Sequence, residues 1–140
     1  MGLDVGSKTI GIAVTDEAEI AAHPHSVLER GGTDVDVSAI STVVANLDIT
    51  DVVIGMPYEL SGKVGHRARR VQEFITALTS TLAGHDALKF HEQDERFTTA
   101  EAERVLIDAD LSRAKRKGVI DQQAAALILQ AWLEIQQRRK

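Results

Sequence analysis

The stretch that decides the fold opens the chain: residues 2–14 read GLDVGSKTIGIAV. Two short apolar runs, residues 2–5 and 10–14, flank the polar segment Gly6-Ser7-Lys8-Thr9. β-Branched residues favour extended backbone, whereas a cluster of Gly, Ser and Thr favours a turn. The stretch therefore predicts a strand, a tight turn and a second strand.

The rest of the chain alternates between strand-like and helix-like apolar spacing. Residues 20–29 predict a third strand, which Pro24 restricts to a sheet edge or a bulge because proline cannot donate to the ladder. Further strands are expected at residues 51–55 and 88–92, helices at 33–47, 65–82, 98–108 and 121–135, and a polar loop at 110–119.

This order of elements indicates the fold class. An antiparallel three-stranded meander followed by βα units predicts an α/β fold with a mixed five-stranded sheet and helices on both faces. A length of 140 residues suits one domain, residues 1–140.

Composition excludes several classes of protein. The chain has no cysteine, which removes disulfides, thiol catalysis and zinc–thiolate sites. No apolar run approaches the roughly 18 residues of a membrane span, and no signal peptide is visible. We therefore expect a cytoplasmic protein with no membrane partner.

The net charge of −5 argues mildly against a nucleic-acid partner, but the distribution of charge matters more than its sum. Three local clusters of basic residues could contact phosphates. The alternative for each cluster is an ordinary solvated helix face. The clusters are Arg67, Arg69 and Arg70; Arg113, Lys115, Arg116 and Lys117; and Arg138, Arg139 and Lys140.

Asp4 is the first candidate functional residue. Aspartate is depleted in strands, yet Asp4 lies between Leu3 and Val5 in a run that should be buried. A buried carboxylate is costly unless a metal ion or hydrogen bonds compensate it. Lys8 in the following turn could add a positive charge beside a phosphate. The alternative is that Asp4 only caps the turn.

Two further acidic sites lie at expected helix entrances. Asp94 and Glu95 are adjacent, so only one of them should face a given side of an extended chain, and Arg96 could neutralise them or contact a substrate. Asp121 is expected to begin the last helix. The structural alternatives are that Asp94 and Glu95 only complement the helix dipole and that Asp121 is only an N-cap.

Taken together, these acids favour a metal site. Oxygen ligands on a chain without cysteine suit Mg²⁺ or Mn²⁺. Carboxylates meeting at one end of a sheet can hold two such ions about 4 Å apart, one activating a water and the other stabilising a leaving 3′ oxygen.

The motifs in order resemble the YqgF (RuvX) family, whose members are described as pre-16S rRNA nucleases and as Holliday junction resolvase-like proteins. The similarity spans essentially the whole chain. It rests on residues 2–16, on residues 53–57 followed by Gly62, on residues 94–99 and on residues 121–130.

The resemblance implies an RNase H-like fold and a metal-dependent nuclease of the bacterial cytoplasm that matures the 5′ end of 16S rRNA. It also implies that Asp4, Glu95 and Asp121 are catalytic and metal-binding. Asp94 and Glu59 remain alternatives for the second ligand.

The expected nucleic-acid contacts come from the turn, from the strand exit and from two of the basic clusters. They are Lys8, Arg67, Arg96, Arg113, Lys115, Arg116 and Lys117.

Three readings of the partner stay open. The substrate is pre-rRNA in a ribosome precursor, or it is a branched four-way DNA junction, or the chain is a nucleic-acid-binding assembly factor without catalysis. The junction reading favours a homodimer with paired sites over a monomer.

Overall fold

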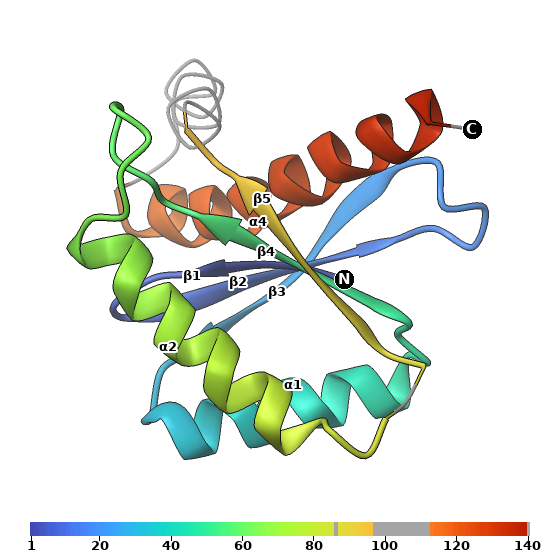
Figure 1. Cartoon of the computed structure of the whole chain (residues 1–140), viewed down its shortest axis with the longest axis horizontal. Coiled ribbons are helices and arrows are strands. Elements are labelled where there is room, and N and C mark those ends of the chain that lie inside the picture. The colour runs from blue at the N-terminus through green and yellow to red at the C-terminus, as the bar shows by residue number, and fades with distance from the viewer. Residues whose placement is uncertain (86, 97–112, 140) are drawn as a thin grey trace.

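The computed structural model of the chain describes residues 1–85, 87–96 and 113–139, of which residues 113–121 are described as backbone only. Five strands form one sheet in the order β3-β2-β1-β4-β5 (Figure 1). The strands are β1 (Gly2–Val5), β2 (Thr9–Thr15), β3 (Ala22–Glu29), β4 (Asp51–Met56) and β5 (Lys89–Asp94). The helices are α1 (Thr33–Asn46), α2 (His66–Thr81) and α4 (Arg113–Arg138).

The sheet is mixed, as the sequence predicts. Strands β1, β2 and β3 pair antiparallel, whereas β4 is parallel to both β1 and β5. The carboxyl ends of β1, β4 and β5 therefore meet at one edge of the sheet.

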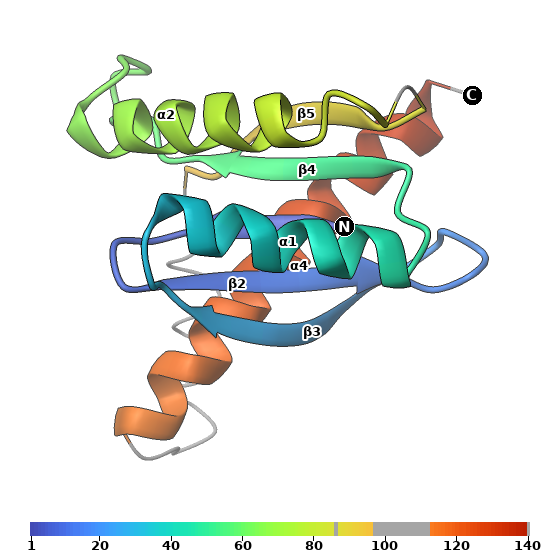
Figure 2. The same ribbon diagram turned by 90° about the horizontal axis from the view of Figure 1, so that it is seen from below.

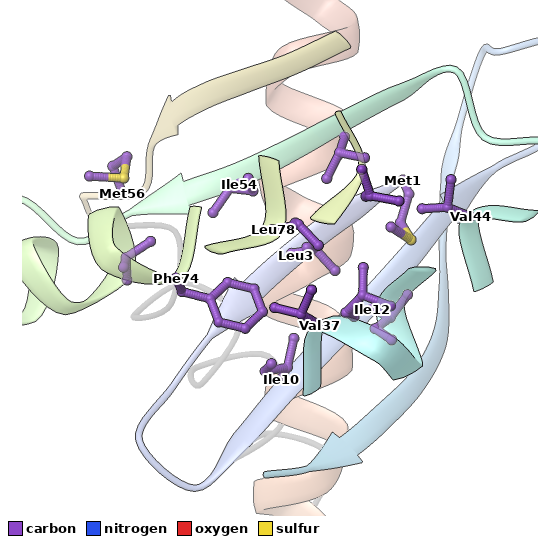
Figure 3. Packing of buried hydrophobic residues seen from close by; sticks show 14 of the residues in the cluster. Met1, Leu3, Ile10, Ile12, Val37, Val44, Ile54, Met56, Phe74 and Leu78 are labelled. Atoms are coloured by element: carbon purple, nitrogen blue, oxygen red, sulfur yellow. The ribbon is translucent and has the colours of Figure 1, made fainter. Parts of the chain in front are cut away.

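Helices cover both faces. Helices α1 and α2 lie on one face and α4 crosses the other (Figures 1 and 2). The larger core lies under α1 and α2 and includes Leu3, Ile54 and Phe74 (Figure 3). The smaller core, with Val53 and Ile128, lies under α4. Because side chains alternate along a strand, β1 sends Leu3 to the first face and Gly2 and Asp4 to the second.

Small residues let α4 approach the sheet closely. A Cβ atom added to Gly2 would lie 2.8 Å from both the Ala125 carbonyl oxygen and the Leu129 Cβ. Any larger residue at position 2 would therefore push the helix away. The glycine keeps α4 against β1, on the face that carries Asp4.

The prediction for Pro24 is confirmed. Strand β3 is an edge strand, and its register with β2 shifts between Ile12 and Ala13. Ile12 pairs with Ser26 and Ala13 with Pro24, so His25 is the extra residue of a β-bulge.

The predicted start of the last helix is wrong. Helix α4 already begins at Arg113, so the expected loop is helical from that residue and Asp121 lies inside the helix rather than at its N-cap. Arg, Ala and Lys are strong helix formers, and the single Gly118 costs only about 1 kcal/mol. The expected helix at 98–108 falls outside the described residues.

The fifth strand ends two residues later than expected, at Asp94. Among the described residues, no helix has the combination of length and apolarity that crossing a bilayer requires.

Candidate active site

The carboxylates of Asp4 and Glu95 meet at the carboxyl edge of the sheet, although β1 and β5 are not neighbours. Strand β4 lies between them, and its Gly55 follows Ile54, the register partner of Leu3. A Cβ atom at Gly55 would clash with Glu95 Oε2 and with the Ile128 side chain. Glu95 therefore reaches Asp4 across a position that has no side chain. On the other side of Asp4, the register partner in β2 is Gly11.

Glu95 is buried, with only 8% of its surface exposed. Burial, followed by the negative charge of Asp4 and a hydrogen bond with Asp4, raises the pKa of Glu95 to about 8. The positive charge of Arg67 opposes this shift. Two carboxyl groups in one buried place favour a shared proton at neutral pH.

This donor set fits a hard divalent cation. Carboxylate oxygens are the ligands that Mg²⁺ and Mn²⁺ prefer. Such an ion would offset both the cost of burying the Glu95 carboxylate and its repulsion by Asp4, which raise the pKa of Glu95. Among the side chains that the structure describes, no group of three acidic or histidine residues is placed to hold an ion. The side chain of Asp121 is outside that set.

The backbone places Asp121 on α4, one helical turn before Ala125, which lies over Gly2. Leu129 and Trp132 share a cavity with Met1 at the start of β1. The earlier turns of α4 therefore extend toward the end of β1 that carries Asp4, as Figure 1 shows.

The two other acidic candidates have different neighbours. Asp94 accepts hydrogen bonds from the Arg96 side chain, with Arg96 Nη2 at 2.6 Å from Asp94 Oδ2. The hydrogen bond with Arg96 lowers the pKa of Asp94. Glu59 packs against Gly65 before α2. The geometry thus pairs Asp4 with Glu95.

Arg96 neutralises Asp94 and also donates a hydrogen bond to the Leu60 carbonyl oxygen, at 3.3 Å. It thereby ties the end of β5 to the loop at residues 57–65. Of the two roles expected for Arg96, the structure shows the neutralising one.

The predicted basic contacts are only partly described. Lys8 is exposed in the β1–β2 turn and Arg67 is exposed on the first turn of α2. Both line a cavity of about 470 Å³. The side chains of Arg113, Lys115, Arg116 and Lys117 lie outside the described residues.

Sequence patterns did not point to Gly11 and Gly55, which flank Asp4 in the sheet, or to His66, which lines the cavity with Lys8 and Arg67. Arg70, a member of the first basic cluster, lines the same cavity. A signal for Gly55 was available, because glycine inside a buried strand often marks a close approach of another group.

Solved structures confirm the RNase H-like fold of the resolvase type. T. thermophilus RuvC in complex with Holliday junction substrate matches with a TM-score of 0.59 and 14% identity, covering 96% of this chain and 94% of that one. The yeast mitochondrial Holliday junction resolvase also matches with a TM-score of 0.59, at 15% identity, covering 98% of this chain and 78% of that one.

Sequence relatives identify the family. Residues 1–135 match the RuvX family, described as Holliday junction resolvase. A protein of Symbiobacterium thermophilum is 41% identical, covering 99% of this chain and 93% of its own length. A protein of Halothermothrix orenii is 40% identical, covering 99% of this chain and 96% of its own length. Both carry the name "Putative pre-16S rRNA nuclease". The chain belongs to the RuvX family.

Proposed function

We propose that the chain is a metal-dependent endonuclease that hydrolyses phosphodiester bonds at the 5′ end of pre-16S rRNA, within a ribosome precursor in the bacterial cytoplasm. The observation that carries this proposal is the buried pair formed by Asp4 and Glu95 at the carboxyl edge of the sheet. The names of relatives about 40% identical over nearly the whole chain support the substrate.

In this proposal Asp4, Glu95 and Asp121 hold two Mg²⁺ or Mn²⁺ ions. Bound ions supply Lewis acidity at the phosphate and lower the pKa of a bound water. Asp121 is included because it lies in α4 one helical turn before Ala125, which packs against Gly2 of β1.

The chain's own residues perform the remaining tasks. Glu95 would release its proton to solvent on becoming a metal ligand. The glycines at positions 11 and 55 leave room over the sheet for the two carboxylates. Lys8 and Arg67 bind substrate phosphates, and Arg96 holds Asp94 away from the pair.

A second candidate substrate is a four-way DNA junction, because the family is described as Holliday junction resolvase. Resolving a junction needs two cuts, so this reading favours a homodimer with paired sites, whereas a single cut in RNA is possible for a monomer.

The test is cleavage of a pre-16S 5′ segment and of a synthetic four-way junction by wild type and by Asp4→Asn. Each reaction is run with Mg²⁺, with Mn²⁺ and with chelator, and Glu73→Gln, an exposed acid on α2, serves as the matched control.

Metal-dependent cutting that Asp4→Asn loses and Glu73→Gln keeps supports the nuclease, and the better substrate decides between RNA and DNA. Binding of both substrates without cutting by any variant would instead indicate an assembly factor without catalysis.

A further inference from the structure

A cavity of about 470 Å³ lies beside the carboxylate pair, between the β1–β2 turn, the end of β3 and the start of α2. It is lined by Val5, the residue after Asp4, and by Arg67, whose charge acts on Glu95. No acidic residue is among the described residues that line it. The basic lining residues are Lys8, Arg30, His66, Arg67 and Arg70. We call this cavity the basic pocket.

One of these lining residues, Arg30, has a structural role. Arg30 Nε donates to the buried carboxylate of Asp36 at 2.9 Å, and Arg30 Nη1 donates to the Gly6 carbonyl oxygen at 3.1 Å. Asp36 therefore offsets the charge of Arg30. Arg30 in turn holds the β1–β2 turn in place, and this turn forms one wall of the pocket.

The charges of Lys8, Arg67 and Arg70 are available to a ligand. Within the part of the chain that the structure describes, no hydrogen bond or ion pair is recorded for the side chains of Lys8 and Arg70. Together with Arg67 they bring three positive charges into one cavity. Like charges that line one cavity repel each other, and an anion bound among them would relieve that repulsion.

The start of α2 adds to this field. The helix spans 16 residues, and its first turn contains no acidic residue. Its N-terminal backbone amides and positive dipole end favour an anion. The Glu59 carboxylate packs against Gly65, just before the helix, but Glu59 does not line the pocket.

We propose that the basic pocket binds a second phosphate group of the nucleic acid, distinct from the phosphate that is cut. The inference rests on the proposed function, because it places the cut at the carboxylate pair. A phosphate in the pocket would fix the strand one step away from Asp4 and Glu95, and Arg67 would link the two sites. The phosphate is an internal diester or a terminal monoester.

The test uses two neighbouring arginines of α2. Arg70 lines the pocket and Arg69 does not, and both are exposed. Binding of a short single-stranded RNA is measured by fluorescence anisotropy over a range of salt concentrations, in chelator so that nothing is cut. Circular dichroism of each variant checks the fold.

We expect Arg70→Gln and Lys8→Gln each to weaken binding about tenfold, as loss of a hydrogen bond to a charged group would. We also expect the salt slope to fall by about one. Arg69→Gln should bind within about twofold of wild type, since a solvated arginine contributes little. If Arg70→Gln binds like Arg69→Gln, the residues are a solvated basic face and the proposal is wrong.

Two forms of the RNA separate the sources of the phosphate. If a terminal phosphate binds, exchanging a 5′-phosphate for a 5′-hydroxyl weakens binding to wild type but not to Arg70→Gln. If an internal diester binds, the two RNAs bind equally and the effect of Arg70→Gln persists in both. Either result supports the pocket. Because binding is measured without cutting, failure of the nuclease assay leaves this result unaffected.

Discussion

At the scale of single residues, the site depends on two acids that meet over a glycine. Gly55 provides the space, and Asp4 and Glu95 supply like charges in a buried position. When no cation is bound, this arrangement is unfavourable at pH values above the pKa of Glu95, because both carboxylates are then charged. It becomes favourable when a divalent cation is present. This stored repulsion predicts a trade-off between stability and activity.

The first prediction concerns stability against pH in chelator. The folded pKa of Glu95 is about 8, above the ordinary value of 4.5, so between these values the folded state holds a proton that the unfolded state has released. The free energy of unfolding should therefore fall as pH rises from about 4.5 to 8. Glu95→Gln removes this dependence and should be more stable than wild type by about 1–3 kcal/mol at pH 8.

Denaturant unfolding of wild type and Glu95→Gln at pH 5, 6.5 and 8 measures this effect. The exposed residue Glu73 provides the control, because Glu73→Gln should keep the wild-type pH dependence. Equal pH dependence in wild type and Glu95→Gln would mean that Glu95 is not the group that titrates.

The second prediction separates the adjacent acids Asp94 and Glu95. Asp94 is held by Arg96 at 2.6 Å, whereas Glu95 contacts Asp4. Glu95→Gln should lower cleavage by more than the roughly 10- to 100-fold that loss of an outer partner costs. Asp94→Asn should lower it by no more than that range. Single-turnover cleavage rates at saturating metal measure both, and the reverse order would exchange the roles of the two acids.

At the scale of elements, local patterns predicted most of the sheet. The β1–β2 hairpin follows from two apolar runs around a Gly-Ser turn, and the bulge at Pro24 follows from its missing N–H. Gly118 was not a reliable sign of where α4 begins. One glycine does not stop a long helix that packs along the sheet.

The choice between Asp94 and Glu95 shows what local patterns leave undetermined. Alternation says that the two side chains diverge, but not which of them faces Asp4. That depends on the parallel register of β5 against β4, in which Met56 pairs with Asp94. Register of this kind is set by contacts between segments distant in sequence.

The third prediction tests strand β4 as a spacer. In Gly55→Ala the new methyl group would collide with the Glu95 carboxylate and the Ile128 side chain. Overpacking of this kind costs about 1–3 kcal/mol, and it would move Glu95 away from Asp4. We expect a lower melting temperature together with loss of cleavage. In Gly84→Ala, where a Cβ meets nothing within 4 Å, both should stay near wild type.

At the scale of the whole molecule, charge is separated along the sheet. The basic pocket lies at the carboxyl edge of β1, whereas a second cavity near Met1 at the opposite end is lined by acids that include Asp16, Glu19 and Asp51. A net charge of −5 conceals this separation. The resulting field would attract a polyanion to the edge with the carboxylate pair and repel it from the other.

The last prediction uses metal binding as a property of the whole fold. A ligand that binds only the folded state stabilises it by about 2.7 kcal/mol at 100 times its dissociation constant, which raises the melting temperature of a domain of this size by several degrees. Mn²⁺ or Mg²⁺ should therefore raise the melting temperature of wild type and of Glu73→Gln, but not that of Asp4→Asn. Because Glu95 must lose its proton to bind a cation, the shift should be larger at pH 8 than at pH 6. A shift of equal size in Asp4→Asn would place the ion elsewhere on the protein and remove the main support for the proposed chemistry.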